Sequence, residues 1–144
     1  MKLAHLADLH LGFRQYARQT ANGINQREAD VAGVFRRAVD DVIEAAPDIV
    51  VVAGDLFHSV RPTNPAILDS FRQFQKLADA LPDTPIVIVA GNHDTPRSVE
   101  TGSILGLFEA IANVNVVSGE ARRLRFEALD LSVLCVPDQA LREA

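Results

Sequence analysis

Three short polar clusters in this sequence contain the residue types that bind metal ions. They are Asp8-Leu9-His10, Gly54-Asp55-Leu56-Phe57-His58 and Gly91-Asn92-His93-Asp94, and they hold three of the four histidines. Carboxylate and imidazole groups are ligands for hard or borderline divalent ions such as Mn²⁺, Fe²⁺ and Zn²⁺. Each cluster alone is commonplace, because Gly-Asp after a strand is often only a turn. Their joint occurrence predicts a metal site, provided that the fold brings the three clusters together.

The segments around these clusters predict how they meet. Each cluster directly follows an apolar run, and segments of helical periodicity separate the runs. This alternation predicts an α/β fold with a mainly parallel sheet and βαβ crossovers. In such folds the ligand site lies at the carboxyl ends of the strands. The expected strands are Lys2–Ala7, Ile49–Ala53, Ile86–Ala90, Asn115–Val117, Leu124–Ala128 and Leu131–Val136, and the expected helices cover residues 26–45, 65–81 and 103–112.

Local signals indicate where these elements begin and end. Asn25 is expected to cap the first helix, with Glu28 completing a capping box. Asn64 is expected to cap the second helix, with Pro65 at the first helical position. The last two strands are expected to pair as a hairpin through Leu129–Asp130.

The composition is that of a globular domain. The 144 residues are 48% hydrophobic and 23% charged, which excludes disorder. No apolar run approaches the ~20 residues of a membrane helix. His5 is expected to be packed or hydrogen-bonded within the first strand, and the single Cys135 to be an inert core thiol in a reducing, cytoplasmic setting. The net charge of −5 does not indicate a nucleic-acid binder, although residues 11–37 have a local excess of positive charge.

Taken together, the three clusters resemble the opening motifs of the calcineurin-like metallophosphoesterases. Met1–Gly12 (MKLAHLADLHLG), residues 54–58 (GDLFH) and residues 91–94 (GNHD) are similar in detail to the DNA double-strand-break repair nucleases of the SbcD type. The resemblance implies the N-terminal portion of a four-layered αββα metallophosphoesterase sandwich. It also implies a metal-dependent exonuclease or endonuclease that hydrolyses phosphodiester bonds by a two-metal mechanism.

Carried over residue by residue, the resemblance implies a centre of two divalent ions. Asp8 and His10 would bind the first ion, Asp55 would bridge both ions, and Asn92 would bind the second. Manganese is the ion expected first, with iron, zinc and magnesium as alternatives. Two such ions about 3.5–4 Å apart can hold a phosphodiester and activate a water for in-line attack.

The resemblance also implies roles for two histidines. His93 would act as general acid or stabilise charge in the transition state, and His58 would pair with His93 and tune it. An imidazole that titrates near neutral pH can supply a proton to the leaving oxygen. Two roles stay open for Asp94: it could orient a neighbouring residue, or it could only cap the following turn, which is the favoured interpretation.

The sequence departs from the family in its later part. The family completes its metal centre with three further histidines, and this sequence has none after His93. Residues 1–144 are therefore expected to be a metallophosphoesterase domain truncated before the last ligand motifs. Such a chain would bind one metal weakly and be poorly active unless another chain completes the site.

Further expectations concern partners. Arg14, Tyr16 and Arg18 lie in a polar loop beside the expected metals and could contact DNA, although a solvated loop explains them equally well. The resemblance implies a homodimer through residues 65–81 and 103–112, and a coiled-coil ATPase subunit of the SbcC type. Core packing is the favoured explanation for the apolar side chains of those helices, which are Phe71, Phe74, Leu105 and Phe108.

Two other functions stay open. One is a phosphomonoesterase or nucleotide phosphodiesterase with the same metal chemistry, and the other is an inactive module that dimerises or binds DNA without cleaving it. His58 and the long opening match favour the nuclease, whereas the missing histidines favour the inactive module for this chain alone. A dinucleotide-binding fold is disfavoured because no Gly-x-Gly-x-x-Gly follows the first strand.

Overall fold

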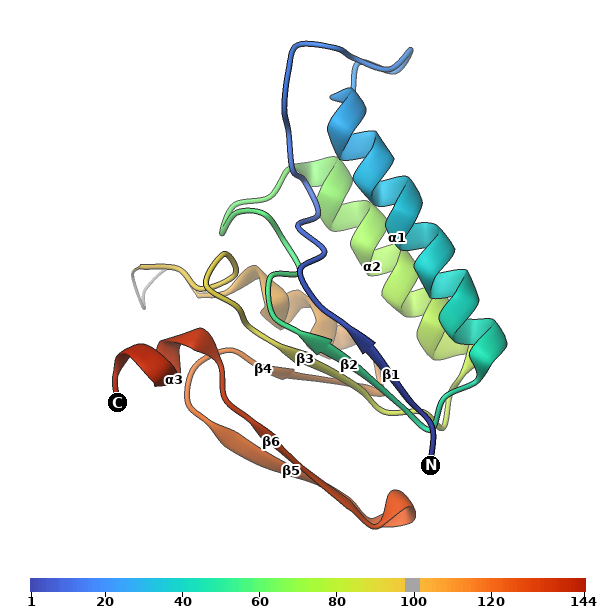
Figure 1. Ribbon diagram of the computed structural model, residues 1–144, viewed down its shortest axis with the longest axis vertical. Helices are drawn as coiled ribbons and strands as arrows, with labels where there is room; N and C mark the ends of the chain where they lie inside the picture. The colour runs from blue at the N-terminus through green and yellow to red at the C-terminus, as the bar shows by residue number, and fades with distance from the viewer. Residues whose placement is uncertain (98–101) are drawn as a thin grey trace.

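A four-stranded parallel sheet forms the centre of the protein. The computed structural model describes residues 1–97 and 102–144 (Figure 1). The sheet order is β1-β2-β3-β4, and Ile86 lies beside Val50 on one side and Val114 on the other. The continuous β-branched runs of the two central strands suit burial on both faces. The expected α/β fold is confirmed, with strands β1 (Leu3–Leu6), β2 (Ile49–Ala53), β3 (Ile86–Val89) and β4 (Val114–Val117).

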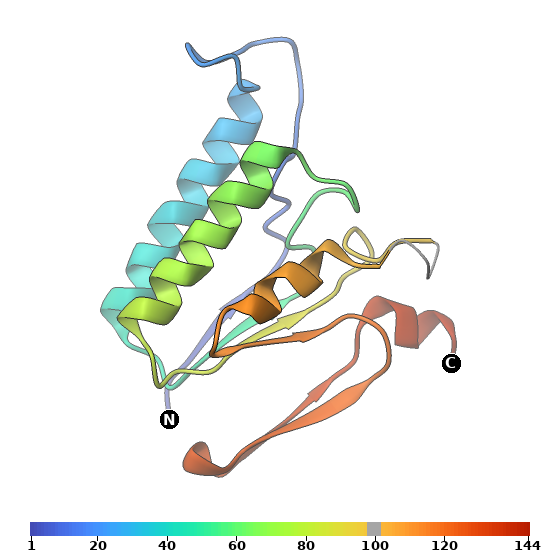
Figure 2. The ribbon, with the colours of Figure 1, turned by 180° about the vertical axis from the view of Figure 1, so that it is seen from behind.

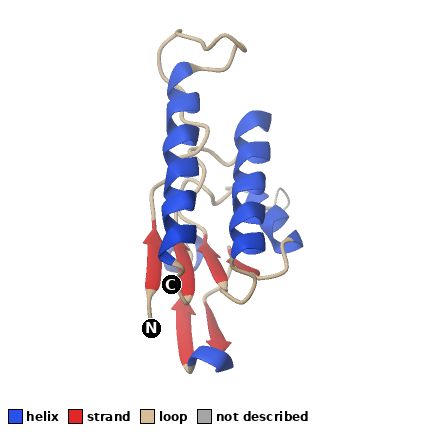
Figure 3. Cartoon of the chain, turned by 90° about the vertical axis from the view of Figure 1, so that its right-hand side faces the viewer, coloured by secondary structure: helices blue, strands red, loops and turns tan. Residues whose placement is uncertain are grey.

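Two long helices cover one face of this sheet. They are α1 (Gln26–Ala45) and α2 (Asn64–Ala80), which lie side by side (Figure 3). A short 3₁₀ helix, η2 (Ile104–Ala110), completes this layer next to α2 (Figure 2). Each of the three helices contributes a fully buried phenylalanine to the core, namely Phe35, Phe74 and Phe108.

A β-hairpin covers part of the opposite face. Its strands β5 (Arg122–Phe126) and β6 (Leu131–Cys135) pair antiparallel around the short 3₁₀ turn η3 (Glu127–Leu129), and the helix α3 (Asp138–Arg142) follows. Cys135 packs with strand residues in a second, smaller core, where burial raises the pKa of its thiol. The predicted core cysteine is therefore confirmed.

The ends of the first helix show one correct and one wrong prediction. The first helix has the predicted bounds, and the side chain of Asn25 caps it by accepting from the backbone N–H of Arg27 at 3.1 Å. Glu28 does not complete a capping box. Its carboxylate instead accepts from the hydroxyl of Thr63 and lies 3.6 Å from Nε of Arg14. Glu28 is buried, and its carboxylate faces Thr63 at the start of α2, a partner distant in sequence.

Three other predicted boundaries differ from the structure. Thr63, not Asn64, caps α2, and its hydroxyl accepts from the N–H of Ala66 at 3.3 Å. The helix expected over residues 103–112 is a seven-residue 3₁₀ helix, because β4 begins four residues after its end and leaves room only for a tight connector. The hairpin is confirmed, but its turn uses residues 127–130, so β5 ends at Phe126 and not at Ala128; it also begins two residues earlier than predicted, at Arg122.

Solvent exposure tests the predictions for His5 and for the apolar side chains of the second and third helices. His5 was expected to be packed or hydrogen-bonded, but it is exposed on the edge strand β1, so the packed alternative is wrong. Phe74, Leu105 and Phe108 are fully buried and Phe71 stacks on Phe108, as core packing predicts. Among the described residues, no helix is both long and apolar enough to cross a membrane.

Candidate metal centre

The loops that follow β1, β2 and β3 lie against one another at the carboxyl edge of the sheet. The backbone N–H of Asp8 donates to the carbonyl of Gly54 at 3.2 Å, and that of His10 donates to the carbonyl of Asp55 at 3.0 Å. The third loop joins them, because the N–H of His93 donates to Oδ1 of Asp55 at 3.0 Å. The predicted convergence of the three clusters is therefore present in the structure.

Backbone strain is concentrated in this region. Asp8, His10 and Asp55 all adopt positive φ, at 55°, 46° and 51°. A non-glycine residue held in this conformation costs of order 1–3 kcal/mol, and such residues cluster at functional sites. Three of the four predicted metal ligands carry this strain, and no pattern in the sequence had indicated it.

Two glycines allow the second and third loops to approach. Gly54 has φ +90°, and a Cβ there would lie 3.3 Å from Cα of Gly91. A Cβ at Gly91 would lie 2.2 Å from Oδ1 and 2.4 Å from the backbone nitrogen of Asp55. A side chain at either position would therefore meet the other loop, which is why glycine is needed where the two loops come closest.

The carboxylate part of the site brings together Asp8, His10 and Asp55. Nε2 of His10 lies 4.0 Å from Oδ1 of Asp8 and 3.8 Å from Oδ2 of Asp55. One potential ligand atom from each residue lies within 4.8 Å of the others. Asp55 is only 8% exposed, whereas Asp8 is open to solvent. Two carboxylates and one imidazole at this spacing are a donor set that fits a divalent ion.

Asn92 lies at the rim of the same region. Its side chain is exposed and lines a hollow of about 540 Å³ together with Asp8, Asp55 and Gly91. The fourth predicted ligand thus shares a cavity with the carboxylates. That cavity is also lined by Val133 and Leu134 of β6, so the hairpin forms another wall of it.

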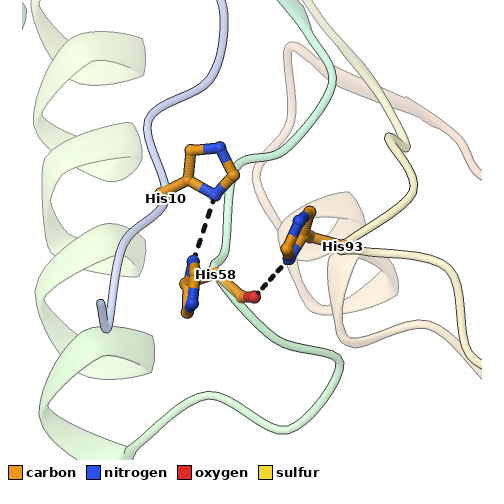
Figure 4. A group of neighbouring side chains, drawn as sticks. All are labelled: His10, His58 and His93. Atoms are coloured by element: carbon orange, nitrogen blue, oxygen red, sulfur yellow. Dashed lines mark hydrogen bonds between the residues drawn. The ribbon is translucent and has the colours of Figure 1, made fainter. Parts of the chain in front are cut away.

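Three histidines form the other part of the site (Figure 4). The rings of His58 and His93 stack at 5.1 Å, and Nδ1 of His93 lies 2.7 Å from the carbonyl oxygen of His58. Nδ1 of His58 also lies 3.3 Å from Nδ1 of His10. Burial, and then the neighbouring His10 and His93, lower the pKa of His58, which favours the neutral form of its ring. Sequence reasoning paired His58 with His93 and missed its contact with His10.

The buried side chain of Asp94 links the second and third loops through hydrogen bonds. It is fully buried, and its carboxylate accepts from the N–H groups of Leu56 at 3.1 Å, Phe57 at 2.9 Å and Gly91 at 3.1 Å. Burial raises the pKa of this carboxyl group despite the three hydrogen bonds, which act in the opposite direction. Asp94 therefore orients its neighbours and does not only cap the following turn, which was the favoured alternative.

The polar loop between β1 and α1 leaves its candidate DNA contacts exposed. Tyr16 is 72% exposed with φ 65°, and Arg18 is exposed as well. Arg14 is more constrained because its Nε lies 3.6 Å from the buried carboxylate of Glu28. The side-chain amide of Asn25 donates to the carbonyl of Tyr16 at 2.8 Å and so connects the loop to the start of α1.

Comparison with known proteins agrees with this site. The sequence profile of the calcineurin-like phosphoesterases matches residues 1–139, and the chain belongs to that family. The chain is 38% identical over 111 residues to the DNA double-strand break repair protein Mre11 of Methanococcus maripaludis, a match that covers 77% of this chain and 28% of the relative. It is 34% identical over 136 residues to Mre11 of Archaeoglobus fulgidus, covering 90% of this chain and 27% of the relative. It is 39% identical over 111 residues to Mre11 of Aeropyrum pernix, covering 76% of this chain and 24% of the relative. The chain thus spans less than a third of the length of these relatives.

Proposed function

We propose that this chain is the metal-binding part of a DNA repair nuclease that hydrolyses phosphodiester bonds with two divalent ions. The observation that carries the proposal is the convergence of Asp8, His10 and Asp55 at one strained edge of the sheet. Similarity to relatives named as DNA double-strand break repair proteins directs it toward DNA.

The donor atoms divide between two ions. Asp8 and His10 would hold the first ion, Asp55 would serve both, and Asn92 would hold the second through its amide oxygen. When bound, such ions neutralise the phosphodiester and lower the pKa of an attacking water. The first ion has three protein ligands here and the second has two, so we expect the first to bind more tightly. Manganese fits this mixed oxygen and nitrogen set, and iron, zinc or magnesium are the alternatives.

His93 is suited to move a proton at the leaving oxygen. The carbonyl of His58 holds a proton on Nδ1 of His93, which leaves Nε2 as the nitrogen that exchanges its proton. The ring of His58 fixes the plane of His93 by stacking, and its lowered pKa favours its own neutral form. We therefore assign proton donation to His93 and positioning to His58.

The polar loop supplies a DNA contact in this proposal. Arg14, Tyr16 and Arg18 expose two cations and one aromatic ring, which suit phosphates and an unstacked base. Arg14→Ala should weaken DNA binding and reduce the salt slope by about 1. Arg123→Ala on β5, beneath the opposite face of the sheet, is the matched control. A slope that is equal in the two variants would remove Arg14 from the DNA contact.

Hydrolysis assays on the 144-residue chain test the function itself. With Mn²⁺, we expect slow hydrolysis in which DNA ends are still cleaved faster than a small phosphate monoester, and we expect Asp55→Asn to abolish it. His5→Asn, which changes an exposed histidine outside the site, should cleave like the unaltered chain. Preference for the small ester would favour a phosphomonoesterase or nucleotide phosphodiesterase. DNA binding without any turnover would favour the inactive module.

Partners and setting complete the proposal. A homodimer through residues 65–81 and 103–112 would use outward side chains such as Leu68 and Leu107, because the buried phenylalanines are not available. A coiled-coil ATPase subunit is proposed as the partner of the whole protein. A reducing cytoplasmic setting is proposed because the single thiol, Cys135, is buried and unpaired among the described residues.

A further inference from the structure

The three histidines form a cluster whose geometry differs from that of the carboxylates. One ring nitrogen from each of His10, His58 and His93 lies within 4.8 Å of the other two. The two Nδ1 atoms of His10 and His58 are 3.3 Å apart. Two imidazole nitrogens on one tetrahedral zinc ion, each at 2.0–2.1 Å, are also about 3.3 Å apart. This pair is therefore already at the spacing of two ligands on one zinc ion.

The groups on the far sides of two rings, one a hydrogen-bonded carbonyl and the other a pair of nearby carboxylates, support the same arrangement. A metal-binding histidine usually donates its other N–H to a carbonyl or carboxylate, which fixes the ring. Nδ1 of His93 faces the carbonyl of His58 at 2.7 Å, which leaves Nε2 of His93 with a lone pair. Nε2 of His10 faces the carboxylates of Asp55 and Asp8 at 3.8 and 4.0 Å, which leaves Nδ1 of His10 for an ion.

We propose that His10, His58 and His93 form a site for a borderline divalent cation, Zn²⁺ in particular, that excludes an ion from the carboxylate site. A neutral imidazole offers one lone pair. When Nε2 of His10 binds an ion with Asp8 and Asp55, Nδ1 of His10 carries the proton and donates to His58. When Nδ1 binds zinc with the other histidines, Nε2 carries the proton and faces the carboxylates.

The consequence is inhibition of the nuclease by zinc, and this part rests on the proposed function. Zinc in the three-histidine site removes a ligand from the first ion and occupies Nε2 of His93, the proposed proton donor. Mn²⁺ favours oxygen ligands and should prefer the carboxylate side, whereas three imidazoles favour Zn²⁺. One imidazole, that of His10, thus decides between the two states.

Direct metal binding to the 144-residue chain tests the site without any hydrolysis assay. Zn²⁺ affinity is measured by competition with a coloured chelator, and Mn²⁺ affinity by the resonance signal of free Mn²⁺. His58→Asn should weaken Zn²⁺ binding by more than the roughly 10–100-fold that loss of an outer hydrogen-bond partner costs, because His58 is a direct ligand of zinc. It should weaken Mn²⁺ binding by no more than that roughly 10–100-fold, because His58 is then only the outer partner of His10. Asp8→Asn should show the opposite order. His5→Asn is the matched control and should change neither affinity.

A measurement on the unaltered chain covers the case in which a variant fails to fold. One equivalent of Zn²⁺ should release bound Mn²⁺, and it should protect His10, His58 and His93, but not His5, from acylation by diethyl pyrocarbonate. Simultaneous binding of both ions would overturn the exclusion. The proposal would also be overturned if both variants lowered the two affinities in the same order, because that result indicates a single shared site. If the unaltered chain did not cleave DNA, the proposed function would be refuted, but these metal-binding results would not change.

Discussion

Replacing Gly91 with alanine tests whether the close contact of two loops builds the metal centre. The new Cβ would lie 2.4 Å from the backbone nitrogen of Asp55 and 2.2 Å from its Oδ1, whereas ordinary contacts begin at 3.4 Å. The carboxylate can rotate away, but the nitrogen belongs to a turn with φ 51° that holds His10 through a hydrogen bond. The loop of Asp55 must therefore move by about 1 Å to restore normal contact.

The expected cost follows from that displacement. Overpacking a closely packed site costs about 1–3 kcal/mol, and a clash with backbone belongs at the upper end. A loss of about 3 kcal/mol lowers the Tm of a chain of this size by roughly 6–12 °C. Because Asp55 moves away from Asp8 and His10, Mn²⁺ should also bind at least about tenfold more weakly.

Thermal unfolding followed by circular dichroism, together with Mn²⁺ titration, measures both effects. Gly106→Ala is the matched control, because nothing lies within 4 Å of a Cβ at that position and its φ is outside the left-handed range. That variant should be as stable as the unaltered chain or gain about 0.4–1 kcal/mol. If Gly91→Ala unfolds at the same temperature as Gly106→Ala and binds Mn²⁺ equally well, the two loops do not depend on their close contact, and the reasoning is refuted.

Four further predictions concern stability. Thr63→Ala should lower the free energy of unfolding by about 1–2 kcal/mol, because α2 loses its cap and buried Glu28 loses a donor, whereas Thr63→Ser should change it little in chemical denaturation. Asp94→Asn should cost about 1–3 kcal/mol, because an amide group would face one of three backbone N–H donors, and denaturation of this variant at neutral pH checks the loss. Burial raises the pKa of Asp94 above 3.8, so the folded state binds this proton more tightly than the unfolded state. The free energy of unfolding should therefore fall as pH rises from 3.8 through the raised pKa. Asp94→Asn should lack this pH dependence, and an identical pH dependence in the variant would show that Asp94 is not its source. Saturating Mn²⁺ at about 100 times its Kd should stabilise the chain by about 2.7 kcal/mol, and chelation or Asp55→Asn should remove the resulting rise in Tm.

Much of the fold was predictable because its signals are local. The β-branched runs of β2 and β3 and the helical period of α1 specify which element forms, and the predicted bounds of α1 match the structure. The alternation of strands and helices then led to a parallel sheet. Errors arose at element ends, where Thr63 rather than Asn64 caps α2 and a 3₁₀ helix replaces the third α-helix. These ends depend on how much space the neighbouring elements leave, which a local pattern does not contain.

The residues of the site were predictable for the same reason. Asp8, Asp55 and Asn92 each follow an apolar strand, and parallel strands end at one edge, so their convergence follows from position in the chain. Their chemical types indicated a divalent ion before any distance was known.

Only the tertiary structure decided how these residues face one another. The contact of His10 with His58 joins residues 48 apart, and Asp94 joins loops 37 and 38 residues apart. The positive φ of Asp8, His10 and Asp55 is uncommon for residues with a side chain, and it occurs where hydrogen bonds join the loops. Sequence patterns report what each segment prefers alone, whereas distances between loops, and therefore which nitrogen of His10 meets which partner, are set by the packing of the whole domain.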